Sequence, residues 1–450
     1  MPGTLNDRGR PRSDLGLGRV LVVNTADKAG GAERSARAIL DGFEALGTET
    51  RLAVGVKLTD DPRVIPLKTS PHIDHRRTNH AGRRAIAGAR RRGERWLGME
   101  EFEHPHSRRV LEVAGMEPDL VLLLNLHGRY FDLRVLSRLS RQVPVVVRLC
   151  DSWLFTGHCA CPLGCARWET GCGACPDLAI PPDVTRDATR INWHRKRRIL
   201  SACRLGVITP SQWLMERARR SILAPAIKSA KVVPNGLDLA VFAPGSRGRA
   251  RLALDLDTDA QILLFVAHEG RVNPFKDFPT LRAAIELLRS RDRDRDRDRD
   301  RDDAKRLELL VVGREGPLEI LGADVRIRHL PGCDAHELVQ LYRAADVYVH
   351  AAPEETFCNT AAEALACGTP VVAACAGGIR EVVEHRRTGV HVTPGRPHEL
   401  AEALRELLDN KDARERMGRE AATSARVRFD GVKNVAEVHA WCAQIASGWS

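Results

Sequence analysis

Two glutamates in residues 353–373 (PEETFCNTAAEALACGTPVVA) form the pattern with the clearest chemistry in this sequence. If a helix begins near Asn359, Glu355 stands on the loop before it and Glu363 lies one turn inside it. The free amides and the macrodipole of such an N-terminus favour a diphosphate, so we place Asn359 and Thr360 among the nucleotide-binding residues. The two carboxylates can then hold hydroxyl groups of a sugar and a ribose. The competing interpretation is a surface helix whose glutamates cap its first turn.

Two cations lie on another expected loop. Arg271 and Lys276 belong to residues 270–278 (GRVNPFKDF), which follow an apolar run at 262–266. Fixed cations stabilise the charge that a departing nucleotide gains in the transition state of a transfer reaction. An arginine and a lysine on an ordinary surface loop are the competing interpretation. The paired glutamates favour diphosphate binding over it.

A glycine pair stands near the start of the chain. Gly30 and Gly31 follow an apolar run at 19–24 and precede a segment with helical spacing at 32–46. A strand, a glycine loop and a helix start in this order are a moderate indication of a ligand-binding turn.

A cysteine cluster is the one feature that suggests a metal. Its thiols belong to Cys159, Cys165, Cys172 and Cys175, with five, six and two residues between successive members. Four thiols at this spacing, ending in a C-x-x-C pair, are typical of a tetrahedral structural zinc site in a reducing compartment. A redox-labile disulfide loop and unligated thiols are the two other interpretations.

The elements that must position these residues alternate along the chain. Short apolar runs separated by segments of helical spacing occur at 19–24, 52–56, 120–124 and 144–149, and a second series follows at 262–266, 307–312, 325–328, 347–350 and 370–373. Strands that alternate with helices predict parallel βαβ units. A chain of 450 residues with 43% apolar and only 4% aromatic residues suits two α/β domains of ordinary size.

The net charge of +11 suits nucleic acid, an anionic membrane surface or phosphorylated substrates, and its sign does not choose among them. Arginine is concentrated at 83–95 and 195–198, which predicts either a solvated helix face or a patch for a membrane surface or an acceptor phosphate. No apolar run reaches the roughly 18 residues of a membrane span. We expect a cytoplasmic protein with peripheral contact at the inner face of the membrane and no nucleic-acid partner.

Several ordered motifs, from about Arg19 to the C-terminus, resemble the family-four retaining glycosyltransferases, specifically their bacterial exopolysaccharide and colanic-acid branch. The resemblance implies the GT-B fold, in which two Rossmann-like domains present parallel sheets to a cleft. It implies transfer of a hexose-type sugar, with retention, from a nucleotide-diphosphate sugar to a glycan or lipid-linked saccharide in polysaccharide biosynthesis. Catalysis requires no cofactor in this family.

The resemblance assigns a role to each expected domain. They are an N-terminal acceptor domain at 15–230 with a Cys-rich loop at 158–176, a C-terminal donor domain at 231–428 with a low-complexity Arg/Asp insert at 291–303, and a helix at 429–450 that packs back on the first domain.

The resemblance also assigns roles in the donor domain. Glu363 contacts the nucleotide ribose, Glu355 contacts the donor sugar, and Arg271 and Lys276 grip the diphosphate. Cys358 stands where the family usually has glycine.

In the first domain the amides of Gly30 and Gly31 approach the phosphate or the acceptor. His127 faces the cleft from an Asn-Leu-His-Gly element. On the acceptor side, Cys150 replaces the histidine of the relatives, and Asp151 after it is kept.

Two other functions stay open. Cys150 and Cys358 suggest a catalytically weak subunit that binds a saccharide or a nucleotide sugar. A nucleotide-sugar 2-epimerase also uses two such domains, but the Cys-rich loop and the glutamate pair argue against it.

Overall fold

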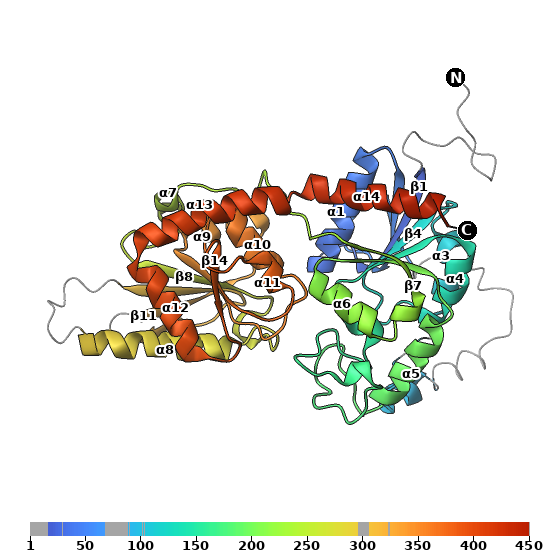
Figure 1. Ribbon diagram of the computed structural model, residues 1–450, viewed down its shortest axis with the longest axis horizontal. Coiled ribbons are helices and arrows are strands. Elements are labelled where there is room, and N and C mark those ends of the chain that lie inside the picture. The colour runs from blue at the N-terminus through green and yellow to red at the C-terminus, as the bar shows by residue number, and fades with distance from the viewer. Residues whose placement is uncertain are drawn as a thin grey trace, which may run out of the picture. The chain divides into compact units, whose positions relative to one another are not determined.

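The computed structural model describes residues 17–28, 30–67, 89, 91–100, 102, 104–295 (290–295 by backbone only), 306–322 and 325–449. It divides into two compact units (Figure 1), the first made of residues 1–234 and 432–450 and the second of residues 235–431.

The first unit is built on a seven-stranded sheet in which every pair of neighbours is parallel. Its strands are β1 (Arg19–Ala26), β2 (Glu49–Val56), β3 (Val64–Pro66), β4 (Leu120–Leu123), β5 (Val145–Arg148), β6 (Leu205–Thr209) and β7 (Ile227–Val232). Their order, β3-β2-β1-β4-β5-β6-β7, reverses direction between β1 and β4. In open parallel sheets ligands bind outside the carboxyl ends of the strands at such a switch point.

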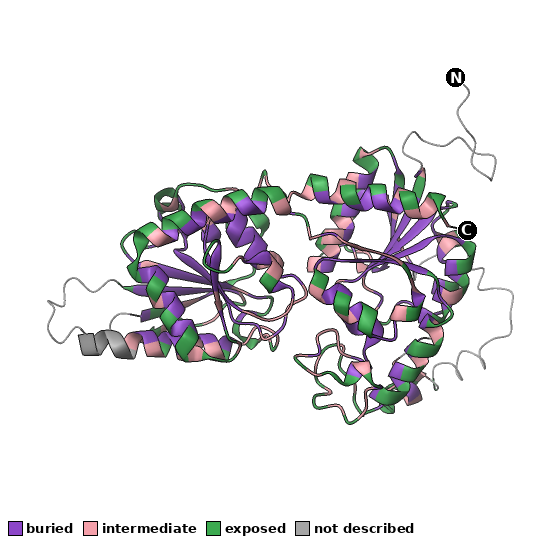
Figure 2. Ribbon diagram, viewed as in Figure 1, coloured by how far each residue is buried: buried purple, intermediate pink, exposed green. Residues whose placement is uncertain are grey.

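Helices cover both faces of this sheet, with their apolar sides turned to the strands (Figure 2). They are α1 (Gly31–Ala45), α3 (Val110–Val113), α4 (Leu136–Gln142), α5 (Thr189–Leu200), α6 (Gln212–Arg220) and α14 (Gly431–Ser447), with 3-10 turns at Pro105–Arg109, Leu133–Val135, Trp153–Phe155, Arg167–Glu169 and Ala224–Ala226. Successive strand residues enter opposite faces of the core. Leu21 and Val23 pack on one side, and Val20 and Val22 on the other.

The last helix belongs to the first unit. Val438, Trp441 and Cys442 of α14 are buried in the cluster that contains Val20 and Val22. The expected domain boundary after residue 230 falls inside β7, because Lys231 is still paired with β6. The structure therefore divides the chain after Pro234.

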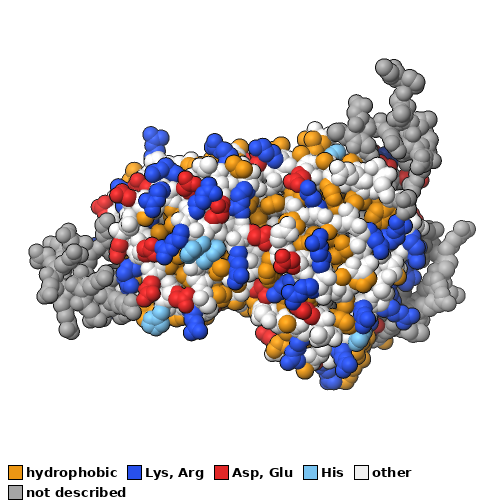
Figure 3. All heavy atoms as spheres, in the orientation of Figure 1, with side chains coloured by type: hydrophobic (Ala, Val, Ile, Leu, Met, Phe, Trp, Pro, Cys, Tyr) orange, Lys and Arg blue, Asp and Glu red, His pale blue; other side chains and the backbone are white. Residues whose placement is uncertain are grey.

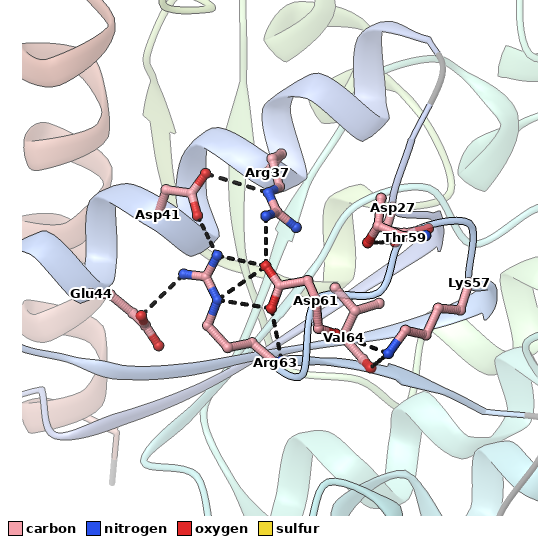
Figure 4. A network of polar contacts seen from close by, with 9 residues as sticks. All are labelled: Asp27, Arg37, Asp41, Glu44, Lys57, Thr59, Asp61, Arg63 and Val64. Atoms are coloured by element: carbon pink, nitrogen blue, oxygen red, sulfur yellow. Dashed lines mark hydrogen bonds and ion pairs between the residues drawn. The ribbon is translucent and has the colours of Figure 1, made fainter.

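A polar network fastens α1 to the edge of the first sheet (Figure 4). The Arg63 guanidinium lies 2.7 Å from Asp41 and 3.0 Å from Glu44 of α1, and 2.7 Å from Asp61. Hydrogen bonds from Arg63 hold the pKa of Asp61 well below its usual range. The network fixes the first helix beside β2 and β3.

The second unit repeats the architecture. Its strands are β8 (Gln261–Val266), β9 (Leu307–Gly313), β10 (Glu319–Leu321), β11 (Val325–Pro331), β12 (Val347–His350), β13 (Val371–Ala374) and β14 (Gly389–Val392). The order is β10-β11-β9-β8-β12-β13-β14, and only the β10–β11 hairpin at the edge is antiparallel.

Its helices are α7 (Arg247–Ala253), α8 (Phe278–Arg295), α9 (Ala335–Ala344), α10 (Asn359–Ala366), α11 (Ile379–Val382), α12 (Pro397–Asp409) and α13 (Lys411–Arg428), with a 3-10 turn at Gly270–Val272. Ile262 and Leu264 face one side of the core, and Leu263 and Phe265 the other. The predicted α/β class is confirmed. Of the Arg/Asp insert, the structure shows α8 continuing to Arg295, and residues 296–303 lie outside the described residues.

The surface does not concentrate charge of one sign on the face that Figure 3 shows, where Asp and Glu lie among Lys and Arg. Of the basic stretch at 195–198, Lys196 is fully buried and Arg195 covers the Phe102 ring at 4.3 Å. Most of the stretch at 83–95 lies outside the described residues. Within the parts of the chain that are described, no helix is both long and apolar enough to cross a bilayer.

Trp441→Ala should destabilise the first unit by about 3–5 kcal/mol, the usual cost of removing a buried tryptophan side chain. A Cβ placed on Gly206 would lie 3.1 Å from the Trp441 ring, so the ring closes directly on β6. Denaturant unfolding followed by circular dichroism measures the loss. Val432→Ala, on the same helix but 83% exposed, is the matched control and should change stability by less than about 0.5 kcal/mol. Equal stability of the two variants would contradict the packing role of α14.

Candidate functional site

The predicted site residues form two groups, one at the carboxyl edge of each sheet. The first follows β1, β4 and β5, and the second follows β8 and β12.

In the first unit, a small pocket lies at the ends of β4 and β5. It is lined by Leu124, Asn125, Leu126, His127, Val147, Leu149, Cys150, Asp151, Trp153 and Leu154. His127 Nε2 lies 2.9 Å from Asp151 Oδ2, and the His127 ring meets the Trp153 ring edge-on at 5.7 Å. The structure thus brings His127, Cys150 and Asp151 together.

The His127–Asp151 pair sets the charge of the pocket. Burial by itself lowers the pKa of His127, but the Asp151 carboxylate raises it by charge and by hydrogen bonding, and the net pKa is raised. The Asp151 carboxylate therefore favours the protonated imidazole.

The Cys150 thiol does not exchange a proton as readily as an imidazole does. Burial raises the pKa of its thiol to about 12, so it is neutral at physiological pH. Its sulfur lies 3.8 Å from the Arg148 carbonyl oxygen. The imidazole that lines this pocket therefore belongs to His127.

Gly30 lies between β1 and α1, as the sequence predicted. Gly30 caps α1 with φ of 103°, a backbone conformation that favours glycine. The Thr25 hydroxyl donates to the carbonyl oxygens of Asn125 and His127, at 3.3 and 3.1 Å. The end of β1 is thereby tied to the loop that follows β4, which lines the pocket.

A buried lysine that the sequence analysis took for part of a basic surface patch supports this pocket. Lys196 Nζ donates to the carbonyl oxygens of Trp153 and Thr156, at 2.7 and 3.1 Å, and to Glu100 at 2.8 Å. The ammonium also lies 3.9 Å from the Trp153 ring centre. Lys196 thereby fixes the loop that carries Asp151. The residues that Lys196 contacts lie far from it along the chain, so the sequence did not predict these contacts.

The structure does not support the predicted zinc site. Within the described residues, one group of three His, Cys or carboxylate side chains has its ligand atoms within 4.8 Å of one another, and it does not lie in the Cys-rich loop. Cys175 instead pairs with His158 Nε2 at 3.3 Å. Burial raises the pKa of Cys159 to about 12 and that of Cys172 to about 11, which favours neutral thiols. None of the twelve cysteines, all of which are described, forms a disulfide.

In the second unit, an ion pair joins the two predicted loops. Lys276 Nζ contacts Glu355 Oε1, and His350 Nε2 lies 3.3 Å from the same oxygen. His350 is the last residue of β12 and was missed, although its place at the end of a predicted strand marks the same sheet edge. Three charged groups therefore converge on the loop before α10.

The charges in this cluster stabilise one another. Burial would raise the pKa of Glu355, but Lys276 and His350 lower it to about 2, so the carboxylate is ionised. Burial would lower the pKa of His350, but Cys358 and Glu355 raise it to about 9.

Cys358 occupies the N-cap position of α10 with φ of 82°, in the left-handed region that favours glycine. Its sulfur lies 3.5 Å from His350 Nδ1 and 3.6 Å from His350 Nε2. The loop is also held from the start of α11, because Gly378 N donates to Glu355 O at 2.7 Å. A Cβ on Gly377 would lie 2.1 Å from that same oxygen.

The other α10 residues point into the second unit. Glu363 is buried and accepts a hydrogen bond from the Tyr342 hydroxyl at 3.0 Å. Thr360 Oγ1 accepts from the Tyr348 hydroxyl at 2.7 Å, and Asn359 Oδ1 accepts from Asn235 at 2.9 Å. The helix begins at Asn359, where the sequence analysis placed it.

Arg271 does not join the Lys276–Glu355 pair. Its Nη1 atom lies 3.0 Å from Glu319 and 3.4 Å from His329 Nε2, on the β10–β11 hairpin. The two cations share a loop but contact different carboxylates.

Comparisons with known proteins agree with these features. Residues 249–424 match the family model described as Glycosyl transferases group 1, in agreement with the predicted glycosyltransferase resemblance. The chain is similar to the D-inositol 3-phosphate glycosyltransferase of Actinosynnema mirum, 39% identical over 208 residues that cover 43% of this chain and 47% of that protein. The chain thus spans about half the length of the curated relatives it matches.

Two solved structures resemble almost the whole chain. Sucrose-phosphate synthase from Thermosynechococcus elongatus has a TM-score of 0.65 at 19% identity and covers 94% of this chain and 97% of its own. Anabaena HepE in complex with UDP has a TM-score of 0.58 at 17% identity, and the match covers 93% of this chain and 98% of HepE. These likenesses confirm the GT-B fold as a pair of Rossmann-like units.

Asp151→Asn should lower the pKa of His127 below that of a free imidazole, because burial then acts without the opposing carboxylate. In the wild type the raised pKa of His127 means that the His127–Asp151 pair stabilises the folded state at low pH. This stabilisation is lost as the pH rises through the folded-state pKa of His127. An NMR titration of the imidazole proton measures the change. Asp41→Asn, at an exposed position of α1, is the control and should leave the titration as it is. An unchanged pKa in Asp151→Asn would show that the pair does not set the charge of the pocket.

Proposed function

We propose that this chain is a retaining glycosyltransferase that transfers a hexose-type sugar from a nucleotide-diphosphate sugar to a glycan or lipid-linked saccharide. The donor binds the second unit and the acceptor binds the first. The group 1 glycosyltransferase match at residues 249–424 supports the assignment of the donor to the second unit.

The observation that carries this proposal is the cluster before α10. An ionised Glu355 beside Lys276 and the start of an eight-residue helix offers a hydrogen-bond acceptor for sugar hydroxyls, a cation for a phosphate and helix amides for the diphosphate. All three features lie at the carboxyl edge of one parallel sheet.

The described side chains of the second unit suggest no covalent nucleophile for the sugar, since Glu355 is held by two cations. We therefore assign front-face attack, in which the acceptor hydroxyl attacks the anomeric carbon from the side of the leaving group. An oxygen of the donor's own phosphate accepts the hydroxyl proton as the bond to the diphosphate breaks. Lys276 stabilises the charge that gathers on the leaving diphosphate.

In the first unit, the His127–Asp151 pair is the group assigned to the acceptor. Its ring nitrogen can hydrogen-bond an acceptor hydroxyl and orient it. The similar Anabaena HepE has been solved in complex with UDP and with UDP-glucose, which makes these the first ligands to test. The name of the Actinosynnema relative adds a small inositol phosphate to the acceptors worth testing.

The test is a panel of nucleotide sugars, screened first by thermal shift and then for donor hydrolysis and transfer. A ligand at one hundred times its dissociation constant adds about 2.7 kcal/mol of stability, which such a screen detects. Turnover with retained anomeric configuration, read by NMR, supports the proposal. Binding of a nucleotide sugar without hydrolysis or transfer to any acceptor supports instead the saccharide-binding subunit that Cys150 and Cys358 suggest.

Glu355→Gln should lower turnover about a hundredfold or more while leaving UDP affinity roughly unchanged, because the lost charge acts on the sugar and the transition state. Steady-state kinetics and calorimetry with UDP measure the two effects. Arg271→Met is the comparison variant, since Arg271 lies on the same loop as Lys276 but contacts Glu319. A loss of UDP affinity equal to the loss of turnover would contradict the sugar role of Glu355.

Glu363→Gln should weaken UDP binding about tenfold or more, because a hydrogen bond to a charged group contributes about 1.5–3 kcal/mol. The amide oxygen still accepts from Tyr342, so the internal contact of α10 is kept. Calorimetry with UDP is the measurement. Tyr342→Phe, which removes only the internal hydrogen bond, separates a packing effect from ribose binding. Equal UDP affinity in wild type and Glu363→Gln would rule out the ribose contact.

A further inference from the structure

The cluster before α10 contains a set of side chains suited to a second ligand. His350, Glu355 and Cys358 have their ligand atoms within 4.8 Å of one another, and they are the one such group within the described ranges. Imidazole nitrogen, carboxylate oxygen and thiolate sulfur are the ligands that zinc prefers. The site assigned above to the sugar donor therefore also has the composition of a metal site.

The distances from His350 Nε2 to the other two ligand atoms are those of a tetrahedral site. Bond lengths of about 2.3 Å to sulfur and about 2.0 Å to nitrogen or oxygen place tetrahedral ligands roughly 3.3 to 3.6 Å apart. His350 Nε2 lies 3.3 Å from Glu355 Oε1 and 3.6 Å from Cys358 Sγ. Because the same sulfur lies 3.5 Å from His350 Nδ1, the imidazole turns about its Cβ–Cγ bond to direct Nε2 at the ion. We propose that Zn²⁺ binds His350 Nε2, Glu355 Oε1 and Cys358 Sγ, with its fourth position open to water or another ligand.

Each ligand is fixed by a different part of the second unit. His350 ends β12, Cys358 is held in the left-handed conformation at the start of α10, and Glu355 is anchored through its backbone by Gly378. His350 and Cys358 are buried, at 1% and 5% exposure, while the Glu355 side chain is 17% exposed. An ion enters from the Glu355 side, and the thiol proton leaves to solvent as the sulfur–metal bond forms.

Lys276 competes with the ion for the Glu355 carboxylate. Its ammonium contacts the same Glu355 oxygen, so the metal and the Lys276–Glu355 pair exclude one another. Zinc binding displaces Lys276 from its carboxylate and occupies the edge where the donor sugar is placed. Zinc therefore inhibits transfer in competition with the donor. This consequence rests on the proposed function, whereas the metal site does not.

The test uses Co²⁺ as a spectroscopic substitute for zinc, added to the reduced full-length chain. Thiolate-to-cobalt absorption is compared in wild type, Cys358→Gly and Cys375→Ala. Glycine at residue 358 removes the sulfur and suits the φ of 82°, so this variant should fold. Cys375 is the matched control, since its sulfur also lies near a histidine, 3.4 Å from His391 Nδ1, but outside the cluster. The cysteines of the first unit give the same background in all three proteins.

We expect Cys358→Gly to bind one equivalent of Co²⁺ fewer than wild type and Cys375→Ala, with a matching loss of thiolate absorption. Cys358→Ser, which keeps the size of the side chain, should lose the same equivalent. Lys276→Met should tighten cobalt binding about tenfold or more by removing the competing ammonium. Equal stoichiometry and spectra in wild type and both Cys358 variants would overturn the site.

An activity assay tests the proposed function separately from the metal site. If cobalt binds as predicted and the chain transfers sugar, zinc should raise the apparent KM for the donor. If cobalt binds but no nucleotide sugar is turned over, the metal site stands and the proposed function fails. If transfer is observed without the Cys358-dependent cobalt signal, the function stands and the metal site fails.

Discussion

The parallel direction of the buried strands is the constraint on which the candidate sites of this protein depend. Strands joined by helical crossovers all end at one edge of their sheet, so loops far apart in sequence meet there. In the first unit this brings His127 to Asp151, and in the second it brings Lys276 to Glu355. The strands themselves are buried on both faces and carry apolar residues, so the chemistry is left to the loops that follow them.

A second constraint acts at these edges, because a partly buried charge needs a partner. Glu355 is held by Lys276 and His350, and Asp151 by His127. Glu363 is likewise satisfied by the Tyr342 hydroxyl. A substrate group that binds any of these carboxylates must therefore replace or share an existing contact. The sites are consequently selective for ligands that bring several hydrogen bonds or charges at once.

Much of this arrangement follows from the sequence. Short apolar runs predicted most strands, and the pattern of residues 353–373 predicted the start of α10. The short strands β3 and β10 carry too few apolar residues to be recognised, and β6 is interrupted by Gly206. Side-chain pairing was harder to foresee. Arg271 turns to Glu319 because a hairpin 48 residues away lies beside it, and Lys196 is buried although its neighbours in sequence are basic.

Two cysteines mark where this chain departs from the family pattern, and their surroundings differ. Cys150 is a neutral thiol in a pocket that already contains the His127 imidazole, so the pocket keeps an imidazole although residue 150 is not a histidine. Cys358 holds a left-handed backbone at a cost of about 1–2 kcal/mol that glycine would avoid. Its sulfur is directed at His350, beside the carboxylate assigned to the donor sugar. Cys358 is thus a strained residue with a specific contact to His350 at the edge of the sheet. This favours a role for the thiol itself, since the backbone conformation alone would be served as well by glycine.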